Sequence, residues 1–358
     1  MIHFLKKANF AQVAVTILVA CIGIVLSSCS SGTALPQATK PVLITMSPDA
    51  TLTPTPFQPE SVGFSTPGIG GSATVQPDFG TWGNFPAPQI YPAYIQIPPP
   101  AILLPRPPGQ IYILLLGSDQ RPNDTGFRTD TMILITLNPQ GKVSLTSFPR
   151  DLYVYIPGWT VQRLNTAQGY GGFNSTALTF EYNFGIHPDY YVLINFDGFR
   201  SVVKSLGGIS VNVAQNFFDS RTGYPNGFNV NAGTVQMDGE TALWYVRSRH
   251  TSNDIDRLRR AQEVIQAIGQ KLLTLNGLSH VPELYNSYHS NVDTNLTLEA
   301  TLKLLPAINL IKNSASISRF VIGYDQAYDW VDPGTGAQVL IPIPEKIQSI
   351  IQQAVTFP

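Results

Sequence analysis

The chain has 358 residues, a formal net charge of −1 and only 13% charged residues. A chain of this length can bury a sizeable hydrophobic core. Its near-neutral charge argues against a general nucleic-acid binder, because such proteins carry a basic surplus. We therefore expect a folded protein with no nucleic-acid partner.

The N-terminus has the pattern of an export signal. Two lysines precede an apolar stretch, 8–26, and the residues Leu-Ser-Ser-Cys at 26–29 resemble the lipobox of bacterial lipoproteins. We predict a signal peptide over 1–28 and a lipidated Cys29 that anchors the protein to the outer face of the cytoplasmic membrane. The alternative is an uncleaved membrane-spanning helix, because the apolar run is nearly long enough to cross a bilayer.

The segment 29–109 has the composition of a tether. It is rich in Pro, Thr and Gly, and seventeen of the 29 prolines fall between Pro36 and Pro108. Proline stiffens such a segment, and the segment lacks the periodic apolar residues that packing requires. We expect an extracytoplasmic tether here and a folded domain over 110–358.

The domain alternates apolar strand patterns with helical patterns. Strands are predicted at 111–116, 131–137, 143–147, 190–195, 209–213 and 317–322. Helices are predicted at 175–183, 198–206, 239–247, 257–273, 298–310 and 344–355. Helix 257–273 carries an apolar stripe of Leu258, Ala261, Ile265, Ile268 and Leu272. This alternation predicts a single three-layer α/β domain with a mixed central sheet between helices.

A charged segment follows the first predicted strand. Its twelve positions hold five ionisable residues: Asp119, Arg121, Asp124, Arg128 and Asp130. Carboxylates suit a divalent cation, and guanidinium groups suit phosphate oxygens, so the mixture suits a metal together with a phosphorylated ligand. The alternative is a solvated loop with local Asp–Arg pairs.

Further arginines follow later elements. Arg150 comes directly after the strand 143–147, which brings it near the charged segment if the strands are neighbours. Five arginines then lie within 14 residues: Arg247, Arg249, Arg257, Arg259 and Arg260. Arginine, unlike lysine, offers planar bidentate forks to phosphate. On the helix, Arg257 and Arg260 are three residues apart and are expected to share a face.

Together these segments resemble the LytR-CpsA-Psr family of bacterial cell-wall enzymes. The matching stretches, in family order, are 113–121 (ILLLGSDQR), 128–134 (RTDTMIL), 147–151 (SFPRD), 163–165 (RLN), 189–196 (DYYVLINF), 206–211 (LGGISV), 237–250 (MDGETALWYVRSRH) and 254–260 (DIDRLRR). Three positions depart from the usual pattern: Phe148 replaces an aliphatic residue, Asp256 replaces a glycine, and Ala261 stands in place of a glutamine.

The resemblance implies a phosphotransferase. Family members move a glycopolymer, such as a teichoic acid or capsular polysaccharide, from a polyprenyl-pyrophosphate carrier to peptidoglycan and release polyprenyl phosphate. An apolar channel in the domain holds the lipid. Carried over to this chain, Asp119 and Asp130 would bind Mg²⁺, with Mn²⁺ as the alternative metal. The residues expected to bind the pyrophosphate are Arg121, Arg128, Arg150, Arg247, Arg249, Arg257 and Arg260.

The predicted chemistry needs charge neutralisation and a base. Asp119, Asp130 and Arg150 are the candidate catalytic residues, and one of the two aspartates is expected to deprotonate the acceptor hydroxyl. Two other functions remain open from the sequence: a hydrolase that splits the lipid pyrophosphate with water, and a non-catalytic polyprenyl-phosphate-binding protein.

Overall fold

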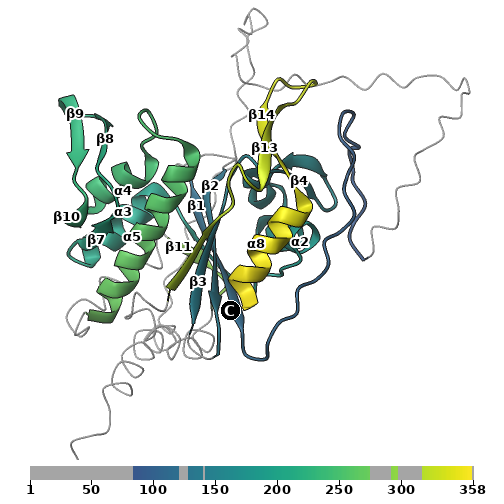
Figure 1. Cartoon of the computed structure of the whole chain (residues 1–358), viewed down its shortest axis with the longest axis horizontal. Coiled ribbons are helices and arrows are strands. Elements are labelled where there is room, and N and C mark those ends of the chain that lie inside the picture. Colours follow the sequence, from purple (N-terminus) through teal and green to yellow (C-terminus); the bar gives the residue numbers. More distant parts are fainter. Residues whose placement is uncertain (1–83, 121–127, 140–141, 275–291, 297–316, 357–358) are drawn as a thin grey trace, which may run out of the picture. The chain divides into compact units, whose positions relative to one another are not determined.

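The computed structural model describes residues 84–120, 128–139, 142–274, 292–296 and 317–356 (Figure 1). All of them lie in one compact unit. The predicted signal peptide, Cys29, most of the predicted tether and the helix expected over 298–310 lie outside these residues. In the described ranges, no helix is both long enough and apolar enough to cross a membrane.

In the described part of the chain, the central sheet has six strands (Figure 1). They are β1 (Ile111–Ser118), β2 (Thr129–Leu137), β3 (Val143–Phe148), β6 (Tyr190–Ile194), β11 (Val292–Thr294) and β12 (Ile317–Val321). Their order across the sheet is β11-β6-β1-β2-β3-β12. The pairs β1–β6 and β3–β12 are parallel, and the other pairs are antiparallel. The sheet is therefore mixed, which confirms the prediction.

Helices cover both faces of this sheet, as the alternation of strand side chains requires. On one face, Leu114, Leu134 and their neighbours pack against α2 (Ala167–Phe184) and α8 (Pro344–Thr356). On the other face, Ile133 packs with Ala261 of α5 (Asp254–Thr274). The predicted three-layer α/β arrangement is thus confirmed.

A second group of elements packs beside α5. It consists of α3 (Phe196–Ser205), β7 (Ile209–Val213), β8 (Phe217–Arg221), β9 (Tyr224–Val230), β10 (Gly233–Met237) and α4 (Gly239–Arg247). β7 pairs with β10, and β8 pairs with β9, in two separate antiparallel ladders. The strand predicted at 209–213 exists, but it lies outside the central sheet. It packs against α5 instead and belongs to the same core cluster as residues of α4.

Two short hairpins extend the other side of the fold. β4 (Tyr153–Ile156) pairs with β5 (Thr160–Arg163), and β13 (Ala327–Val331) pairs with β14 (Gln338–Pro342). A single turn of 3-10 helix, Leu164–Thr166, leads from β5 into α2. These hairpins were not predicted, because four- and five-residue strands leave a weak periodic signal.

Three details differ from the predictions. α2 begins eight residues before the predicted helix and is kinked at Gly172, whose φ of 63° is left-handed. β6 was expected to be buried, yet of its residues only Leu193 is, because Val192 and Ile194 line a cavity. Leu272 was placed in the apolar stripe but is 48% exposed, since the core contacts of α5 end at Ile268.

Candidate functional site

A cavity of about 400 Å³ lies between α5, α4, α3 and the strands β1, β2 and β6. Aliphatic and aromatic side chains form most of its wall, among them Phe199, Val246 and Ile265. The charged residues of its lining are Asp130, Arg150, Arg247, Arg249 and Arg257, which we call the charged end. The cavity is therefore amphipathic, with an apolar interior and a predominantly basic end.

A β-bulge aims Asp130 at this site. Gly117 pairs with Thr131 and Ser118 with Thr129, so Asp130 is the extra residue on β2. A bulge re-aims the side chain that it leaves unpaired. The Asp130 Oδ1 atom lies 3.0 Å from Arg150 Nη1, and Asn165 Nδ2 donates to the same oxygen at 3.5 Å.

Arg150 reaches Asp130 because β3 lies next to β2, and it follows β3 directly, as the sequence suggested. Asp151 lies on its other side, with 3.4 Å between Arg150 Nε and the carboxylate. Burial alone lowers the pKa of Arg150, but the charges of Asp130 and Asp151 outweigh it and raise that pKa above its usual value. The guanidinium is thus held as a permanent cation.

Asp119 and Arg128 form a pair of their own at the neighbouring ends of β1 and β2. Arg128 donates its main-chain N–H to Asp119 Oδ1 at 2.8 Å, and its Nη2 lies 3.4 Å from Oδ2. Neither residue lines the cavity, and the Arg128 side chain is 58% exposed. This local pair matches the alternative interpretation of the charged segment, a solvated loop with local Asp–Arg pairs. Arg121 and Asp124 lie outside the described residues.

Asp254 joins two arginines of the charged end, a role that the sequence did not indicate. Its carboxylate accepts from Arg257 Nε at 2.9 Å and from Arg249 Nη1 at 3.2 Å. Burial raises the pKa of Asp254. The hydrogen bonds and the charge of Arg257, together with the charge of Arg150, lower it by more, so the pKa lies below its ordinary value. The Nη1 atom of Arg257 donates to the Asp130 carbonyl at 2.9 Å, which ties α5 to β2.

Arg247 completes the charged end from the last turn of α4. Its guanidinium lies over the Phe196 ring, 4.0 Å from the ring centroid. A cation held on an aromatic face keeps its N–H edges directed away from that face. The cavity thus receives arginines from the turn after β3, from α4, from α5 and from the loop between the two helices.

Arg260 was expected to bind the pyrophosphate together with Arg257, but only Arg257 lines the cavity. Arg260 is fully buried over the Phe217 and Tyr245 rings. It pairs with Asp256 at 2.9 Å and donates to the Ser248 carbonyl at 2.5 Å. Burial lowers the pKa of Arg260. Arg260 therefore holds the segment between Arg247 and Arg249 and is not placed to contact a ligand in the cavity.

Two of the three departures from the family pattern, Asp256 and Ala261, lie on α5. Asp256 pairs with both Arg259 and Arg260. Gln262, beside Ala261, is buried and donates to Ser147 Oγ at 2.8 Å and to the Phe320 carbonyl at 2.8 Å. Gln262 therefore ties α5 to β3 and β12, whereas Ala261 lines the cavity.

The donor set near Asp130 fits a magnesium ion. Asn165 Oδ1 is buried and has no hydrogen-bond partner, although the amide of the same side chain contacts Asp130. Within the described ranges no three His, Cys, Asp or Glu residues form a metal-binding group. Mg²⁺ needs fewer protein ligands, because it usually binds one or two carboxylates and completes its octahedral coordination with water and substrate phosphates. Asp130 and the orphaned amide oxygen therefore fit the ion, with Asp119 at the adjacent strand end.

The fold and the site define a class of α/β protein with an amphipathic cavity between its mixed sheet and α5. The model of the LytR_cpsA_psr family matches residues 101–350. The chain belongs to this family.

Two relatives are similar over the middle of the chain. The polyisoprenyl-teichoic acid–peptidoglycan teichoic acid transferase TagU of Oceanobacillus iheyensis is 35% identical over 204 residues, 54% of this chain and 62% of that protein. Its counterpart TagT of Bacillus subtilis is 34% identical over 220 residues, 60% of this chain and 68% of that protein. The chain thus spans a little under two thirds of the TagU relative's length.

The structure of TagT bound to LIIa-WTA superposes with a TM-score of 0.56 at 28% identity. The match covers 74% of this chain and 97% of that chain. The mixed α/β fold is therefore shared with solved members of the family.

Proposed function

We propose that the protein is an extracytoplasmic phosphotransferase that moves a glycopolymer from a polyprenyl-pyrophosphate carrier to peptidoglycan. The transfer named in TagU and TagT supports this reaction type. The observation that carries the proposal is the amphipathic cavity, because an apolar interior with an arginine-rich end fits a prenyl chain joined to a pyrophosphate.

In the proposed complex, the prenyl tail fills the apolar part of the cavity and the pyrophosphate lies at the charged end. Arg150, Arg247, Arg249 and Arg257 donate hydrogen bonds to the phosphate oxygens, for which their planar forks are suited. Asp254 fixes Arg249 and Arg257 before the ligand arrives. Donors that are already in place stabilise developing charge without reorganising during the reaction.

The proposed reaction is a displacement at the phosphorus atom that carries the saccharide. An acceptor hydroxyl oxygen forms a bond to this phosphorus, and the bond to the bridging oxygen breaks. The electron pair leaves with polyprenyl phosphate, whose new charge the arginines neutralise. The hydroxyl proton passes to Asp130, which lines the cavity, whereas Asp119 does not.

Asp130, Asp119 and Asn165 would hold Mg²⁺. When bound, this ion would neutralise negative charge on the pyrophosphate oxygens. The proposed location rests on the export signal and lipobox of the sequence, which would keep the domain at the outer face of the membrane where lipid-linked polymers and peptidoglycan meet.

Product analysis tests the proposal. The full chain is incubated with Mg²⁺, a synthetic C20 prenyl pyrophosphate that carries a radiolabelled saccharide, and soluble peptidoglycan strands. A transferase produces label bound covalently to peptidoglycan through phosphate. Free labelled saccharide phosphate would instead identify a hydrolase, and tight lipid binding without turnover would identify a carrier protein.

A further inference from the structure

Residues 84–105 form an extended strap along the outside of the domain. Ile90 and Leu104 donate their main-chain N–H groups to carbonyls of the β4–β5 turn and of the C-terminal end of α2, each at 3.0 Å. Between these two points, Ile97 is buried in a cluster of aromatic and aliphatic side chains. The strap is therefore part of the folded domain, and the side chains on its outer side have fixed positions.

The strap contains no charged residue. None of its 22 residues is Asp, Glu, Lys, Arg or His, and seven of them are prolines. Proline has no main-chain N–H, so a proline-rich segment brings fewer hydrogen-bond donors to an apolar surface. The strap can therefore approach a medium of low polarity at little cost in lost hydrogen bonds.

Large apolar side chains on the outer side of the strap are exposed in two groups. The first group, which we call the strap cluster, consists of Ile90, Tyr91 and Tyr94, and the second consists of Ile102 and Leu103. All five side chains belong to residues that are at least 48% exposed. Single exposed apolar residues are ordinary, whereas groups of them mark a surface for a partner.

The strap cluster is joined to the end of the domain that holds the charged end of the cavity. The Tyr94 ring packs on Gly334 in the turn of the β13–β14 hairpin, where a Cβ atom would lie 3.0 Å from it. This hairpin follows β12, which is parallel to β3, so it leaves the sheet at the edge where Arg150 follows β3 (Figure 1). The Leu340 N–H of β14 donates to the Asp151 carbonyl at 2.9 Å, which fixes the hairpin at this edge.

The second group lies at the other end of α2. Ile102 packs so closely on Gly185 that a Cβ atom there would overlap the Ile102 carbonyl oxygen. Gly185 follows the last residue of α2, whereas Asn165, just before α2, contacts Asp130. The 18 residues of α2 therefore separate Ile102 and Leu103 from the charged end. The two exposed groups share a strap and a composition but lie at different ends of the domain.

The hairpin on which Tyr94 packs is also apolar on its outside. Tyr328 and Val331 of β13 and Tyr324 in the turn before it are exposed. Tyrosine is enriched at bilayer interfaces, because its ring is apolar and its hydroxyl group stays hydrated. The exposed Asp325 and Asp329 of the same segment disfavour an anionic polymer as a partner. This surface therefore fits a neutral lipid interface.

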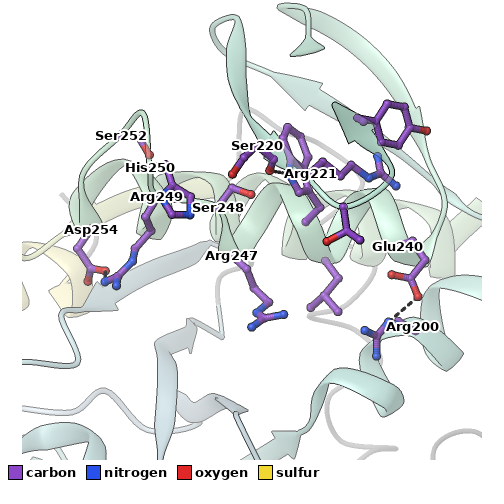
Figure 2. A pocket seen from close by; sticks show the side chains of 14 residues that line it. Arg200, Ser220, Arg221, Glu240, Arg247, Ser248, Arg249, His250, Ser252 and Asp254 are labelled. Atoms are coloured by element: carbon purple, nitrogen blue, oxygen red, sulfur yellow. Dashed lines mark hydrogen bonds and ion pairs between the residues drawn. The ribbon is translucent and has the colours of Figure 1, made fainter. Parts of the chain in front are cut away.

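We propose that the strap cluster and the β13–β14 hairpin rest on the outer surface of the lipid bilayer and hold the charged end beside it. The inference rests on the proposed function, whose donor carries a prenyl chain embedded in that bilayer. Arg247 and Arg249 line a polar groove of about 820 Å³ as well as the cavity (Figure 2), so the charged end is open to the surroundings. A bilayer at this end gives the pyrophosphate a short path to these arginines.

The place of the strap in the chain favours a bilayer over a second protein. Residues 30–83 connect the strap with the predicted lipidated Cys29. An anchored chain keeps the strap at a high effective concentration near the membrane, so even a weak interfacial contact is populated. A partner protein that diffuses freely lacks this advantage.

Photochemical crosslinking in the anchored full chain tests the contact. Benzoylphenylalanine replaces either Tyr94 or Ile102, and the protein is reconstituted in phosphatidylcholine vesicles whose lipid carries an alkyne tag. On illumination we expect crosslinks to lipid from position 94 and none above background from position 102. Because Ile102 is the more exposed of the two residues, exposure alone would give the opposite result.

Two double variants test the consequence for transfer. Ile90→Ser with Tyr94→Ser removes two interfacial side chains, and it should lower the rate with a long-chain prenyl donor embedded in vesicles roughly tenfold. Its rate with the soluble C20 donor should equal that of wild type, since this donor does not depend on how the domain lies on the bilayer. Ile102→Ser with Leu103→Ser is the matched control and should leave both rates unchanged.

The inference is overturned if position 94 forms no lipid crosslinks or if both positions crosslink to lipid equally. Crosslinks from position 94 to a second copy of the chain would assign the surface to self-association and overturn it as well. An equal change of rate with the two donors in the Ile90→Ser, Tyr94→Ser variant would also contradict it. A wild-type protein that transfers from neither donor would refute the proposed function, whereas the crosslinks would still decide where the strap lies.

Discussion

Arg150 Nη1 lies 3.0 Å from Asp130 Oδ1, so a residue that follows β3 is locked to a bulge residue of β2. Both side chains are partly exposed, at 21% and 24%, and both face the cavity. The pair therefore presents a fixed cation and a fixed carboxylate to whatever occupies the charged end. This arrangement makes each residue sensitive to loss of the other.

Replacing either member of this pair should abolish most of the transfer activity. Arg150→Ala removes a donor to the pyrophosphate, and Asp130→Ala removes the proposed base and metal ligand. Loss of one such preorganised group typically lowers kcat by about 100- to 1,000-fold. The measurement is the initial rate of transfer from a C20 prenyl-pyrophosphate saccharide to peptidoglycan.

Circular dichroism would show that both variants remain folded, and Arg319→Ala serves as the control for removal of an exposed arginine. Full activity in either Arg150→Ala or Asp130→Ala would refute the assignment of the charged end as the reaction site.

The sequence predicted five of the six described central strands, because their apolar runs are long, but it did not predict the three-residue strand β11. It also predicted that Arg150 lies near the charged segment, since that required only that β2 and β3 be neighbours. It failed for Arg260, whose partner rings come from β8 and α4. β8 alternates buried and exposed residues over only five positions, so its place against α5 could not be inferred locally.

The role of Asp254 was missed for a related reason. Asp254 lies at the start of α5, where a helix N-terminus favours a negative charge whatever its partners are. The contact with Arg249 depends on how the loop 248–253 turns, and Arg260 fixes that loop through the Ser248 carbonyl. Helical spacing cannot predict a contact that another element determines.

Filling the cavity should weaken prenyl binding without affecting the charged end. Ile265 lines the apolar part, so Ile265→Trp would displace part of a bound chain. Each buried methylene contributes about 0.8 kcal/mol, and exclusion of two should weaken geranylgeranyl pyrophosphate binding roughly tenfold. Inorganic pyrophosphate should bind as before, and Ile265→Leu should behave like wild type. If Ile265→Trp weakened the binding of geranylgeranyl pyrophosphate and of inorganic pyrophosphate equally, the cavity would not be the prenyl site.

Removal of divalent cations should stop transfer, and added Mg²⁺ should restore it. Asn165 offers an unpartnered amide oxygen beside Asp130, so Asn165→Ala should raise the Mg²⁺ concentration needed for half-maximal rate by roughly tenfold. The exposed Asn212 on β7 provides the control variant, Asn212→Ala. An unchanged Mg²⁺ requirement in Asn165→Ala would exclude this oxygen as a ligand.

Arg260 and Arg249 should differ in what they contribute to stability. Arg260→Met leaves Asp256 with one cation fewer and the Ser248 carbonyl without its donor, and breaking such a buried pair costs about 3–5 kcal/mol. Arg249 is 47% exposed, so Arg249→Met should change the free energy of unfolding by less than about 1 kcal/mol. Urea denaturation measures both values. A similar loss of unfolding free energy in Arg260→Met and Arg249→Met would contradict the structural role of Arg260.

Acid should destabilise the protein partly through Asp254. Burial raises the pKa of this carboxyl. The hydrogen bonds and charge of Arg257, together with the charge of Arg150, lower it by more, so its folded pKa lies below that of the unfolded chain, about 3.9. The unfolded state therefore binds the proton first as the pH falls. The stabilisation is fully present well above pH 4 and is lost as the pH falls toward the folded pKa. Urea denaturation between pH 7 and pH 3 should show a flatter dependence in Asp254→Asn than in wild type. Asp325→Asn, at an exposed position, should keep the wild-type slope, and an equal slope in Asp254→Asn would refute this coupling.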